Sequence, residues 1–492
     1  MLAIDAGTTG VTALLVTDDG RISSRGYEEF PQHFPRPGWV EHEPEQIWQA
    51  TLSACRQALR GDVAPPTAIG ITNQRETAVV WDRERLSAPR RAIVWQDRRT
   101  TDICDRLRAD GHEDRVGDLT GLRLDPYFTG TKLTWLAEHD TGTWDGVREG
   151  RLVVGTVDSY LVARLTGGNV HATDASNASR TLLFDLARGQ WSDELCDLLS
   201  VPPTALPEVR PSSGDFGRTD PDAFLGLDLP ISGIAGDQQA ALFGQVCFAP
   251  GTSKCTYGTG PFVLVNTGAE PVRSEHGLLT TVAWDLGAGL VYALEGAIFV
   301  TGAAVQWLRD GLGLIDSAAE VEGLARTVAD SEGVVFVPAL TGLGAPHWDP
   351  GARGAIVGIT RGTTRAHLAR ATLEAIAFEV RDVVDVMTRD AGIDIPELSV
   401  DGGASANDLL CQLQADQLQV PVRRPQVAET TALGAAFLAG LATGVWGSTD
   451  ELADTWRLDR RFDPADDADG TRDAAYRRWQ QAVQRSMGWA TT

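Results

Sequence analysis

The chain of 492 residues is too long for a single hydrophobic core, and its 43% hydrophobic and 22% charged residues are typical of a folded globular protein. Its formal net charge of −24 disfavours nucleic acid as a partner, because a polyanion would be repelled. Only two of the 43 basic residues are lysines, Lys132 and Lys254, and neither stands in a Walker-type glycine-rich loop, which excludes a P-loop kinase.

Cysteine usage and the first residues of the chain bear on the compartment. Six cysteines are scattered without the paired spacing of a zinc site or a redox dithiol, so we expect reduced and mostly buried thiols. The N-terminus lacks a basic region followed by an apolar one, and no run is long and apolar enough to span a membrane. We therefore expect a cytoplasmic protein with no integral membrane segment.

The first predicted element is an apolar strand that stops at Asp5, passes through glycine and threonine from Gly7 to Gly10, and resumes as far as Val16. The ordinary interpretation is a tight turn between two strands. A hairpin rich in glycine and threonine can also wrap a polyphosphate, because its backbone N–H groups and hydroxyls are all donors. The pattern alone leaves both interpretations open.

Strands and helices alternate along the rest of the chain, which indicates an α/β fold. Residues 68–82 are two short apolar runs around a polar elbow, and residues 98–111 predict a helix that buries Ile103 and Leu107. Residues 254–268 place Gly-Thr-Gly between strand-like segments, as at the start of the chain. This repeat predicts a domain boundary near residue 246, with one hairpin from each half facing a shared cleft.

Two further turns have the composition of ligand-binding sites. In residues 233–245 the glycine-flanked Asp237 precedes a predicted helix, which brings backbone N–H groups and a carboxylate to one place. In residues 400–408 a strand ends in Gly402 and Gly403, where the backbone can closely approach a ring or a ribose. Taken singly, these are equally well a helix N-cap and a loop.

A series of longer motifs stands in a fixed order along the chain. They are "PGWVEHEPEQIW" (37–48), "GITNQRET" (70–77), "AIVWQDRRT" (92–100), "DPYFTGTKLTWL" (125–136), "SNASRT" (176–181), "SGIAGDQQAALFGQ" (232–245), "TYGTG" (256–260), "ALEGA" (293–297), "TGLGAPHWDP" (341–350) and "VDGGASAN" (400–407). Over essentially the whole chain they resemble the FGGY family of carbohydrate kinases, and in particular its members that phosphorylate glycerol. The resemblance implies two actin-like (ribonuclease H-like) α/β domains, residues 1–246 and 247–492, that flank a cleft for ATP and a polyol.

The resemblance also implies a glycerol site. Glycerol has three hydroxyls on a short carbon stem, so its pocket needs several polar groups and an aromatic wall. The implied hydroxyl-binding residues are Arg75, Glu76, Asp237 and Gln238, and the implied wall is Trp95, Tyr127 and Phe262. Asp237 is the expected general base, which takes the acceptor proton as phosphoryl transfer to sn-glycerol 3-phosphate proceeds.

For ATP and Mg²⁺ the resemblance implies a second set of residues. Those placed around the nucleotide are Thr8 and Thr9, Gly258 and Thr259 of the opposing hairpin, and Gly302, Gln306, Gly403 and Asn407 of the nucleoside pocket. Asp5 and Asp237 are expected to hold Mg²⁺, largely through water. Many glycerol-phosphorylating members carry glutamine and arginine where this chain has Ala6 and Thr12, which leaves nucleotide preference open.

Two alternatives remain open at this point. A related kinase for another polyol or a ketose fits the same motifs, although Trp95 and Phe262 would crowd a longer substrate. An actin-like ATPase without a small-molecule acceptor accounts for the phosphate hairpins but leaves Arg75, Glu76, Trp95 and Tyr127 without a purpose. A homo-oligomer, dimer or tetramer, is expected in either kinase.

The sequence also bears on regulation. Some bacterial relatives bind fructose 1,6-bisphosphate through a loop that ends in a Gly-Gly-Thr-Arg-like stretch, and others are activated when a sugar-transport phosphocarrier phosphorylates a histidine in that loop. In residues 214–233 of this chain Asp228 replaces the arginine and no histidine is present, so neither control is expected. The acidic run 463–470 lacks the spacing of a calcium loop and predicts an exposed loop.

Overall fold

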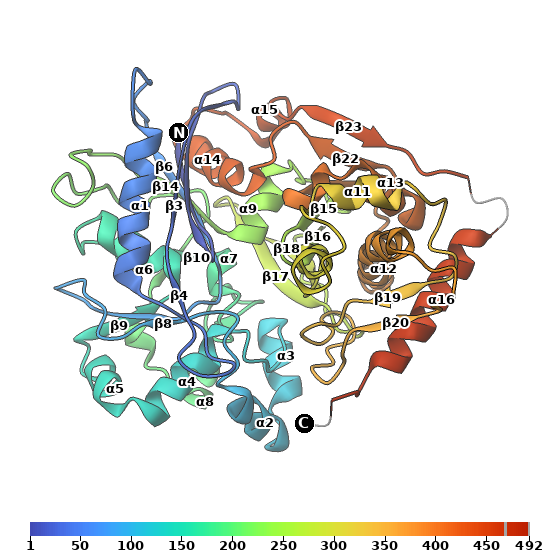
Figure 1. The fold of residues 1–492 in the computed structure, drawn as a ribbon. Helices are drawn as coiled ribbons and strands as arrows, with labels where there is room; N and C mark the ends of the chain where they lie inside the picture. The colour runs from blue at the N-terminus through green and yellow to red at the C-terminus, as the bar shows by residue number, and fades with distance from the viewer. Residues whose placement is uncertain (467–469, 491–492) are drawn as a thin grey trace.

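The computed structural model describes residues 1–466 and 470–490, and it consists of two α/β halves that lie side by side (Figure 1). Each half is built around one large sheet. Part of the acidic run 463–470, residues 467–469, lies outside the described residues.

The sheet of the first half has five strands in the order β14–β6–β1–β2–β3. Their bounds are Ile231–Gly236, Ile69–Asn73, Leu2–Ala6, Gly10–Val16 and Ile22–Glu29. β1 and β2 form the antiparallel hairpin predicted at the start of the chain, while β6 and β14 run parallel to β1. The central strands are apolar on both faces because helices cover both sides of the sheet.

The sheet of the second half has seven strands in the order β17–β18–β16–β15–β21–β22–β23. Their bounds are Leu279–Asp285, Leu290–Ala297, Pro261–Gly268, Ser253–Tyr257, Leu398–Asp401, Val422–Pro425 and Leu458–Phe462. β15 forms an antiparallel hairpin with β16 and is parallel to β21, just as β1 forms a hairpin with β2 and is parallel to β6. The internal repeat inferred from the two glycine-threonine turns is therefore present in the topology of the sheets.

Helices cover the two sheets and fill the lower part of the first half (Figure 1). Those of the first half are α1 (Pro44–Ala58), α2 (Thr101–Ala109), α3 (Glu113–Thr120), α4 (Thr129–His139), α5 (Thr141–Arg148), α6 (Val157–Leu165), α7 (Ala175–Ala178), α8 (Asp193–Leu198) and α9 (Asp237–Gly244). Those of the second half are α10 (Gly302–Gln306), α11 (Glu320–Ala325), α12 (Arg365–Ala391), α13 (Asp408–Leu418), α14 (Thr430–Ala442), α15 (Thr449–Ala453) and α16 (Thr471–Ser486). The helix predicted in residues 98–111 is α2, and it buries Ile103 and Leu107 as expected.

The remaining strands are short and form separate sheets of two or three strands. They are β4 (Gln32–His33), β5 (Glu41–His42), β7 (Val79–Asp82), β8 (Ala92–Ile93), β9 (Leu152–Gly155), β10 (Ala172–Asp174), β11 (Phe184–Asp185), β12 (Gln190–Trp191), β13 (Glu208–Arg210), β19 (Val335–Val337) and β20 (Ala355–Val357). All six cysteines are buried and none is paired in a disulfide, which agrees with the predicted burial. Among the described residues, no helix has the length and apolarity needed to cross a membrane.

The two halves meet at a pair of helices, α9 and α14, which lie between the two sheets in Figure 1. They cross very closely, because a Cβ at Gly434 would come within 1.9 Å of the carbonyl oxygen of Ala240, and one at Gly244 within 2.0 Å of that of Thr430. α14 comes late in the chain yet packs on β14, β6 and β1 of the first sheet. A side chain at either position would clash, so glycine is required for this close contact between the two halves.

Candidate active site

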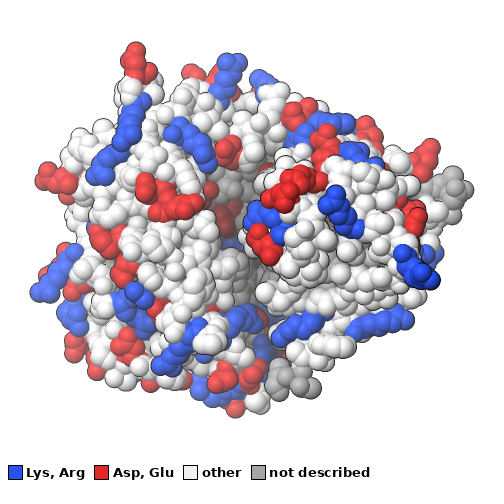
Figure 2. Space-filling model, in the orientation of Figure 1, with Lys and Arg blue, Asp and Glu red and all other residues white. Residues whose placement is uncertain are grey.

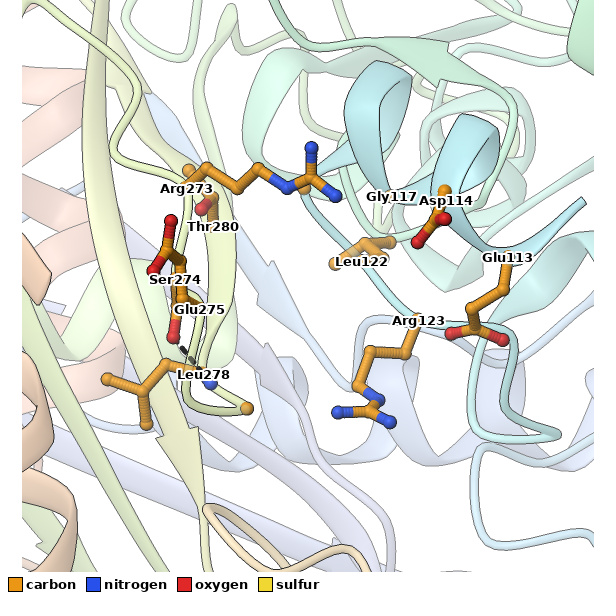
Figure 3. A pocket seen from close by; sticks show the side chains of 12 residues that line it. Glu113, Asp114, Gly117, Leu122, Arg123, Arg273, Ser274, Glu275, Leu278 and Thr280 are labelled. Atoms are coloured by element: carbon orange, nitrogen blue, oxygen red, sulfur yellow. Dashed lines mark hydrogen bonds between the residues drawn. The ribbon is translucent and has the colours of Figure 1, made fainter.

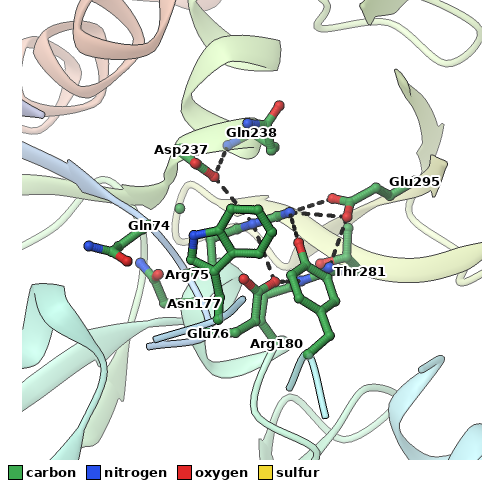
Figure 4. A network of polar contacts seen from close by, with 12 residues as sticks. Gln74, Arg75, Glu76, Asn177, Arg180, Asp237, Gln238, Thr281 and Glu295 are labelled. Atoms are coloured by element: carbon green, nitrogen blue, oxygen red, sulfur yellow. Dashed lines mark hydrogen bonds and ion pairs between the residues drawn. The ribbon is translucent and has the colours of Figure 1, made fainter. Parts of the chain in front are cut away.

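The residues predicted to bind the acceptor gather where parallel strands of the first sheet end. Arg75 and Glu76 follow β6, and Asp237 follows β14, its neighbour in the sheet. Figure 4 shows the side chain of Arg75 lying between Asp237 and Glu295, which comes from β18 of the second half. The polar elbow predicted within residues 68–82 therefore lies where the two halves meet.

The guanidinium of Arg75 is surrounded by protein acceptors. Its Nε lies 3.2 Å from Oδ1 of Asp237 and 3.5 Å from Oε1 of Glu76. Its Nη2 donates to Oε1 of Glu295 and to the hydroxyl of Tyr127, both at 3.0 Å, and its Nη1 donates to Oε2 of Glu295. Only 2% of the Arg75 side chain is exposed, so Arg75 and Glu76 form a buried ion pair and not a solvated one.

Two members of this network, Arg180 and Glu295, were not singled out as site residues from the sequence. Nε of Arg180 donates to Oε1 of Glu76 at 2.8 Å, and its Nη2 donates to Oε1 of Glu295 at 2.8 Å. Both side chains are fully buried. Burial opposes ionisation of Glu295, but Arg180 and Arg75 together hold its pKa at about 2. The sequence feature that could have identified Glu295 is its position inside the apolar strand "YALEGA", because a charge buried in a strand needs a partner.

Asp237 is the carboxylate of this network that faces the cleft. Its side chain is 30% exposed, against 2% for Glu76 and none for Glu295. Burial raises its pKa and the neighbouring Arg75 lowers it. As the first residue of α9, Asp237 also lies where the helix dipole favours a negative charge. It is an accessible carboxylate held in place, which suits a proton acceptor.

The three predicted wall residues lie around this cluster. The rings of Trp95 and Tyr127 pack edge to face with their centroids 5.6 Å apart. The guanidinium of Arg75 lies 5.7 Å from the centre of the Phe262 ring. Gln238 follows Asp237 and donates its backbone N–H to the carboxylate of that residue at 2.7 Å. All seven residues predicted for the acceptor are thus brought together.

The first glycine-threonine turn adjoins the same cluster. Gly7 and Gly10 close the turn between β1 and β2 with a backbone hydrogen bond of 3.0 Å, which leaves Thr9 exposed and Thr8 half-buried. Nε1 of Trp95 donates to Oγ1 of Thr8 at 2.9 Å. The predicted phosphate hairpin is therefore in direct contact with the predicted acceptor wall.

The second glycine-threonine turn carries Gly258 and Thr259, both exposed, between β15 and β16. Gly302 opens α10 and donates its N–H to the carbonyl oxygen of Gly258 at 3.1 Å. Gln306 is exposed at the end of the same helix. The first of the two predicted nucleoside segments thus packs directly on the second hairpin.

The other predicted nucleoside segment follows β21. Gly403 is exposed at the start of a 3₁₀ helix, η3 (Gly403–Ala406). Its neighbour Gly402 has φ +81° and lies so close to the second hairpin that a Cβ would be 2.5 Å from the carbonyl oxygen of Tyr257. Asn407 caps α13, and its Oδ1 accepts from the N–H of Leu410 at 2.9 Å. The helix therefore already uses the carboxamide oxygen of Asn407.

Asp5 is the predicted metal residue of the first hairpin. It lies near the end of β1, opposite Thr72 of β6, and so at the same edge of the sheet as Asp237. Burial, and then the negative charge of Asp237, raise the pKa of Asp5 to about 7. Two carboxylates that repel each other at one edge of a sheet form a donor pair suited to a hard divalent cation.

The cleft itself is visible on the surface as a groove between the two halves (Figure 2). On the face shown, acidic and basic side chains are intermixed on both sides of this groove. A pocket of about 540 Å³ borders Gly402 and Gly403 on the side of β22. The predicted nucleoside segment is therefore open to a ligand.

A separate pocket of about 470 Å³ lies between α3 and the segment that leads into β17. Figure 3 shows Arg123 and Arg273 extending from its two sides, with Glu113, Asp114 and Glu275 beside them. It contains none of the residues predicted for acceptor or nucleotide. Acidic and basic groups are both present, so its lining favours no one class of ligand.

Comparison with known proteins agrees with this arrangement. The model of the FGGY carbohydrate kinase N-terminal domain matches residues 1–244, and that of the C-terminal domain matches residues 253–443. The glycerol kinase of Bordetella parapertussis is 54% identical over 100% of this chain and 97% of its own length. The glycerol kinase of Ralstonia nicotianae is 56% identical over 98% of this chain and 97% of its own length.

A solved structure shows the same architecture. The crystal structure of Plasmodium falciparum glycerol kinase with ADP superposes with a TM-score of 0.91 at 35% identity, and the match covers 99% of this chain and 97% of that one. The two sheets, each with its glycine-threonine hairpin, are thus the two actin-like domains of this class of kinase. Since family models match both halves and relatives are more than half identical along its length, the chain belongs to the FGGY family of carbohydrate kinases.

Proposed function

We propose that this protein transfers the γ-phosphoryl group of ATP to glycerol and releases sn-glycerol 3-phosphate and ADP. The observation that carries the proposal is the compact acceptor cluster, in which the charged elbow of Arg75 and Glu76, the partly exposed carboxylate of Asp237 and the rings of Trp95 and Phe262 converge. A small polyol fits such a site, because it needs several polar contacts and one apolar wall. The curated glycerol kinases support the same substrate.

In the proposed reaction Asp237 takes the proton of the attacking hydroxyl as the bond to phosphorus forms. Arg75 orients the Asp237 carboxylate through its Nε and is itself held by Glu295, so the base keeps one position relative to glycerol. Thr8, Thr9, Gly258 and Thr259 offer backbone N–H groups and hydroxyls to the phosphates from two sides. Gly302, Gln306, Gly403 and Asn407 are proposed to line the nucleoside pocket.

Asp5 and Asp237 are proposed to hold Mg²⁺, with water completing its coordination. The fit rests on their position at one edge of the first sheet and on their mutual repulsion, which a divalent cation relieves. When bound, the ion would neutralise charge on the transferred phosphoryl group.

Activity on a substrate panel tests this proposal. ADP formation is measured with glycerol, dihydroxyacetone, erythritol, xylulose and ribulose, and glycerol is expected to give the highest kcat/KM. A higher value with a ketose or a longer polyol would assign the protein to a different substrate within the family. Hydrolysis of ATP that is independent of every acceptor, together with polymerisation at high protein concentration, would instead indicate an actin-like ATPase.

Gly302→Ala tests the nucleotide side of the cleft separately. A Cβ at this position would lie 2.8 Å from the carbonyl oxygen of Gly258 and would push the second hairpin out of place. We expect the KM for ATP to rise at least about fivefold while the KM for glycerol stays within about twofold. Gly323→Ala, in a helix where an added Cβ meets open space, is the control and should change neither constant. An unchanged ATP KM for Gly302→Ala would remove Gly302 from the nucleotide site.

Control by fructose 1,6-bisphosphate or by a phosphocarrier is not expected. In the loop 214–233 the side chain of Arg218 is paired with Asp228 at 2.6 Å, so the loop offers no free cation to a bisphosphate. Activity with millimolar fructose 1,6-bisphosphate, and separately after incubation with a phosphorylated carrier, should equal that of the untreated enzyme. Clear inhibition by the sugar bisphosphate, or stimulation by the carrier, would contradict this prediction.

Domain limits, location and assembly remain part of the proposal. We place the domains at 1–246 and 247–492, on either side of the turn between α9 and β15, and we propose that the enzyme works in the cytoplasm.

A homo-oligomer is proposed as well. It is supported by β20, which pairs with β19 alone and, with the residues that follow it, exposes Val357 and Ile359.

A further inference from the structure

The chain keeps lysine at only two positions, although it has 43 basic residues. Arginine supplies the positive charge everywhere else, at the surface and in the buried network. Both lysines, Lys132 and Lys254, are completely buried. Lysine occurs only at these two buried positions. This distribution indicates that arginine could not make the contacts required there.

The hydrogen bonds of Lys132 are of a kind that arginine could not make. Its ammonium donates to the carbonyl oxygens of three consecutive residues, Pro126, Tyr127 and Phe128, at 2.9, 2.6 and 2.9 Å. An ammonium directs three donors around one point, whereas a guanidinium spreads five donors in a plane. A guanidinium would not match the three carbonyl oxygens around Nζ of Lys132. This explains why lysine, and not arginine, stands at position 132.

Lys254 is also fully buried, and it lies beside the acceptor cluster through its contact with Gln238. It lies on β15, four residues before the second glycine-threonine turn. Its Nζ donates to Oε1 of Gln238 and, at 2.8 Å, to Oγ1 of Thr256. Gln238 follows Asp237 in α9 of the first half, so this contact also joins the two halves beneath the acceptor cluster.

The contact decides which way the Gln238 carboxamide faces. An ammonium only donates, so the atom of Gln238 that it meets must be the oxygen. The Nε2 group of Gln238 then lies on the opposite side of the carboxamide and serves as a donor. A free glutamine in the cleft would turn between its two orientations and offer the acceptor a donor in one of them only.

We propose that Lys254 is a positioning residue for acceptor binding, which fixes the Gln238 carboxamide so that its N–H donors face a hydroxyl of the polyol. This inference rests on the proposed function, in which Gln238 binds glycerol. The Lys254 side chain is fully buried and is not itself exposed to the cleft. Its effect is exerted through Gln238, and that dependence can be measured.

The first experiment compares Lys254→Met with the wild type. Methionine retains much of the volume and lacks the donors, so the KM for glycerol is expected to rise at least about tenfold while the KM for ATP stays within about twofold. The Kd of glycerol, measured by calorimetry without ATP, should rise by the same factor. Ser253→Ala on the same strand, whose hydroxyl donates to the carbonyl oxygen of Glu397 at 3.0 Å, is the matched control and should leave the glycerol KM unchanged.

The second experiment is a double-mutant cycle with Gln238→Leu. If Lys254 acts through Gln238, adding Lys254→Met to Gln238→Leu raises the glycerol KM by less than about twofold further. Independent effects that multiply would overturn the proposal, as would a Lys254→Met protein with wild-type glycerol KM or with equal rises in both KM values. Lys254→Gln, which keeps one neutral donor, should fall between wild type and Lys254→Met, and it carries the test if the methionine variant does not fold.

The outcome is distinguishable from failure of the proposed function. Wild-type turnover with glycerol tests that function, and its absence would show that glycerol is not the acceptor. The ratio of variant to wild-type constants tests Lys254, and it has meaning only where the wild type binds glycerol. A wild type that is active on glycerol together with an unchanged Lys254→Met therefore refutes this inference alone.

Discussion

Replacing Asp237 with Asn is expected to lower kcat by at least about 100-fold while glycerol still binds. Asparagine keeps the shape of the side chain but cannot take the proton of the attacking hydroxyl. Asp237 is the carboxylate of the charged network that reaches the cleft, with 30% of its side chain exposed, so no buried neighbour can replace it. Steady-state kinetics give kcat, and calorimetry gives the glycerol Kd.

Asp193→Asn is the matched control for this substitution. Asp193 is also the first residue of a helix, α8, but it lies on the surface and outside the acceptor cluster. Its replacement should leave kcat within about twofold of the wild-type value. An Asp237→Asn protein that retains more than about a tenth of the wild-type kcat would show that another group accepts the proton.

Replacing Arg75 with Ala is expected to damage both acceptor binding and the fold. The change leaves Glu295 and Glu76 buried with less compensating charge, and breaking such a buried pair costs about 3–5 kcal/mol of stability. Loss of charged hydrogen bonds at the acceptor, on the order of 1.5–3 kcal/mol, should raise the glycerol KM at least about tenfold. The KM for ATP should change little. Urea unfolding and steady-state kinetics measure the two effects separately.

Arg99→Ala separates these two consequences. Arg99 is equally buried and pairs with Asp97 and Glu41, but it makes no contact with the acceptor cluster. It should therefore lose a similar amount of stability and keep a glycerol KM within about twofold of wild type. If Arg75→Ala behaves like Arg99→Ala, with a loss of stability only, then Arg75 supports the fold and does not help to bind the acceptor.

Much of this protein follows from short stretches of its sequence. The two glycine-threonine turns, the helix that begins at Asp237 and the helix in residues 98–111 are local features, and the structure has them where the sequence predicts them. Local patterns succeed here because a turn or a helix start depends on a few neighbouring residues. The repeated hairpin likewise predicts two halves of related topology, and each of the two large sheets contains one such hairpin.

The burial of the charged residues at the site depends on contacts between segments that are far apart in the sequence. Arg75 and Glu76, adjacent in an elbow, have the composition of a solvated pair, and they are buried because Glu295 and Arg180 arrive from distant parts of the chain. Those contacts span 220 and 104 residues of sequence, so no local pattern reports them. The hydrogen bond between Lys254 and Gln238 is likewise not predicted by the residues next to Lys254 in the sequence. A buried charge is stable only among partners, and packing of the two halves determines which partners it has.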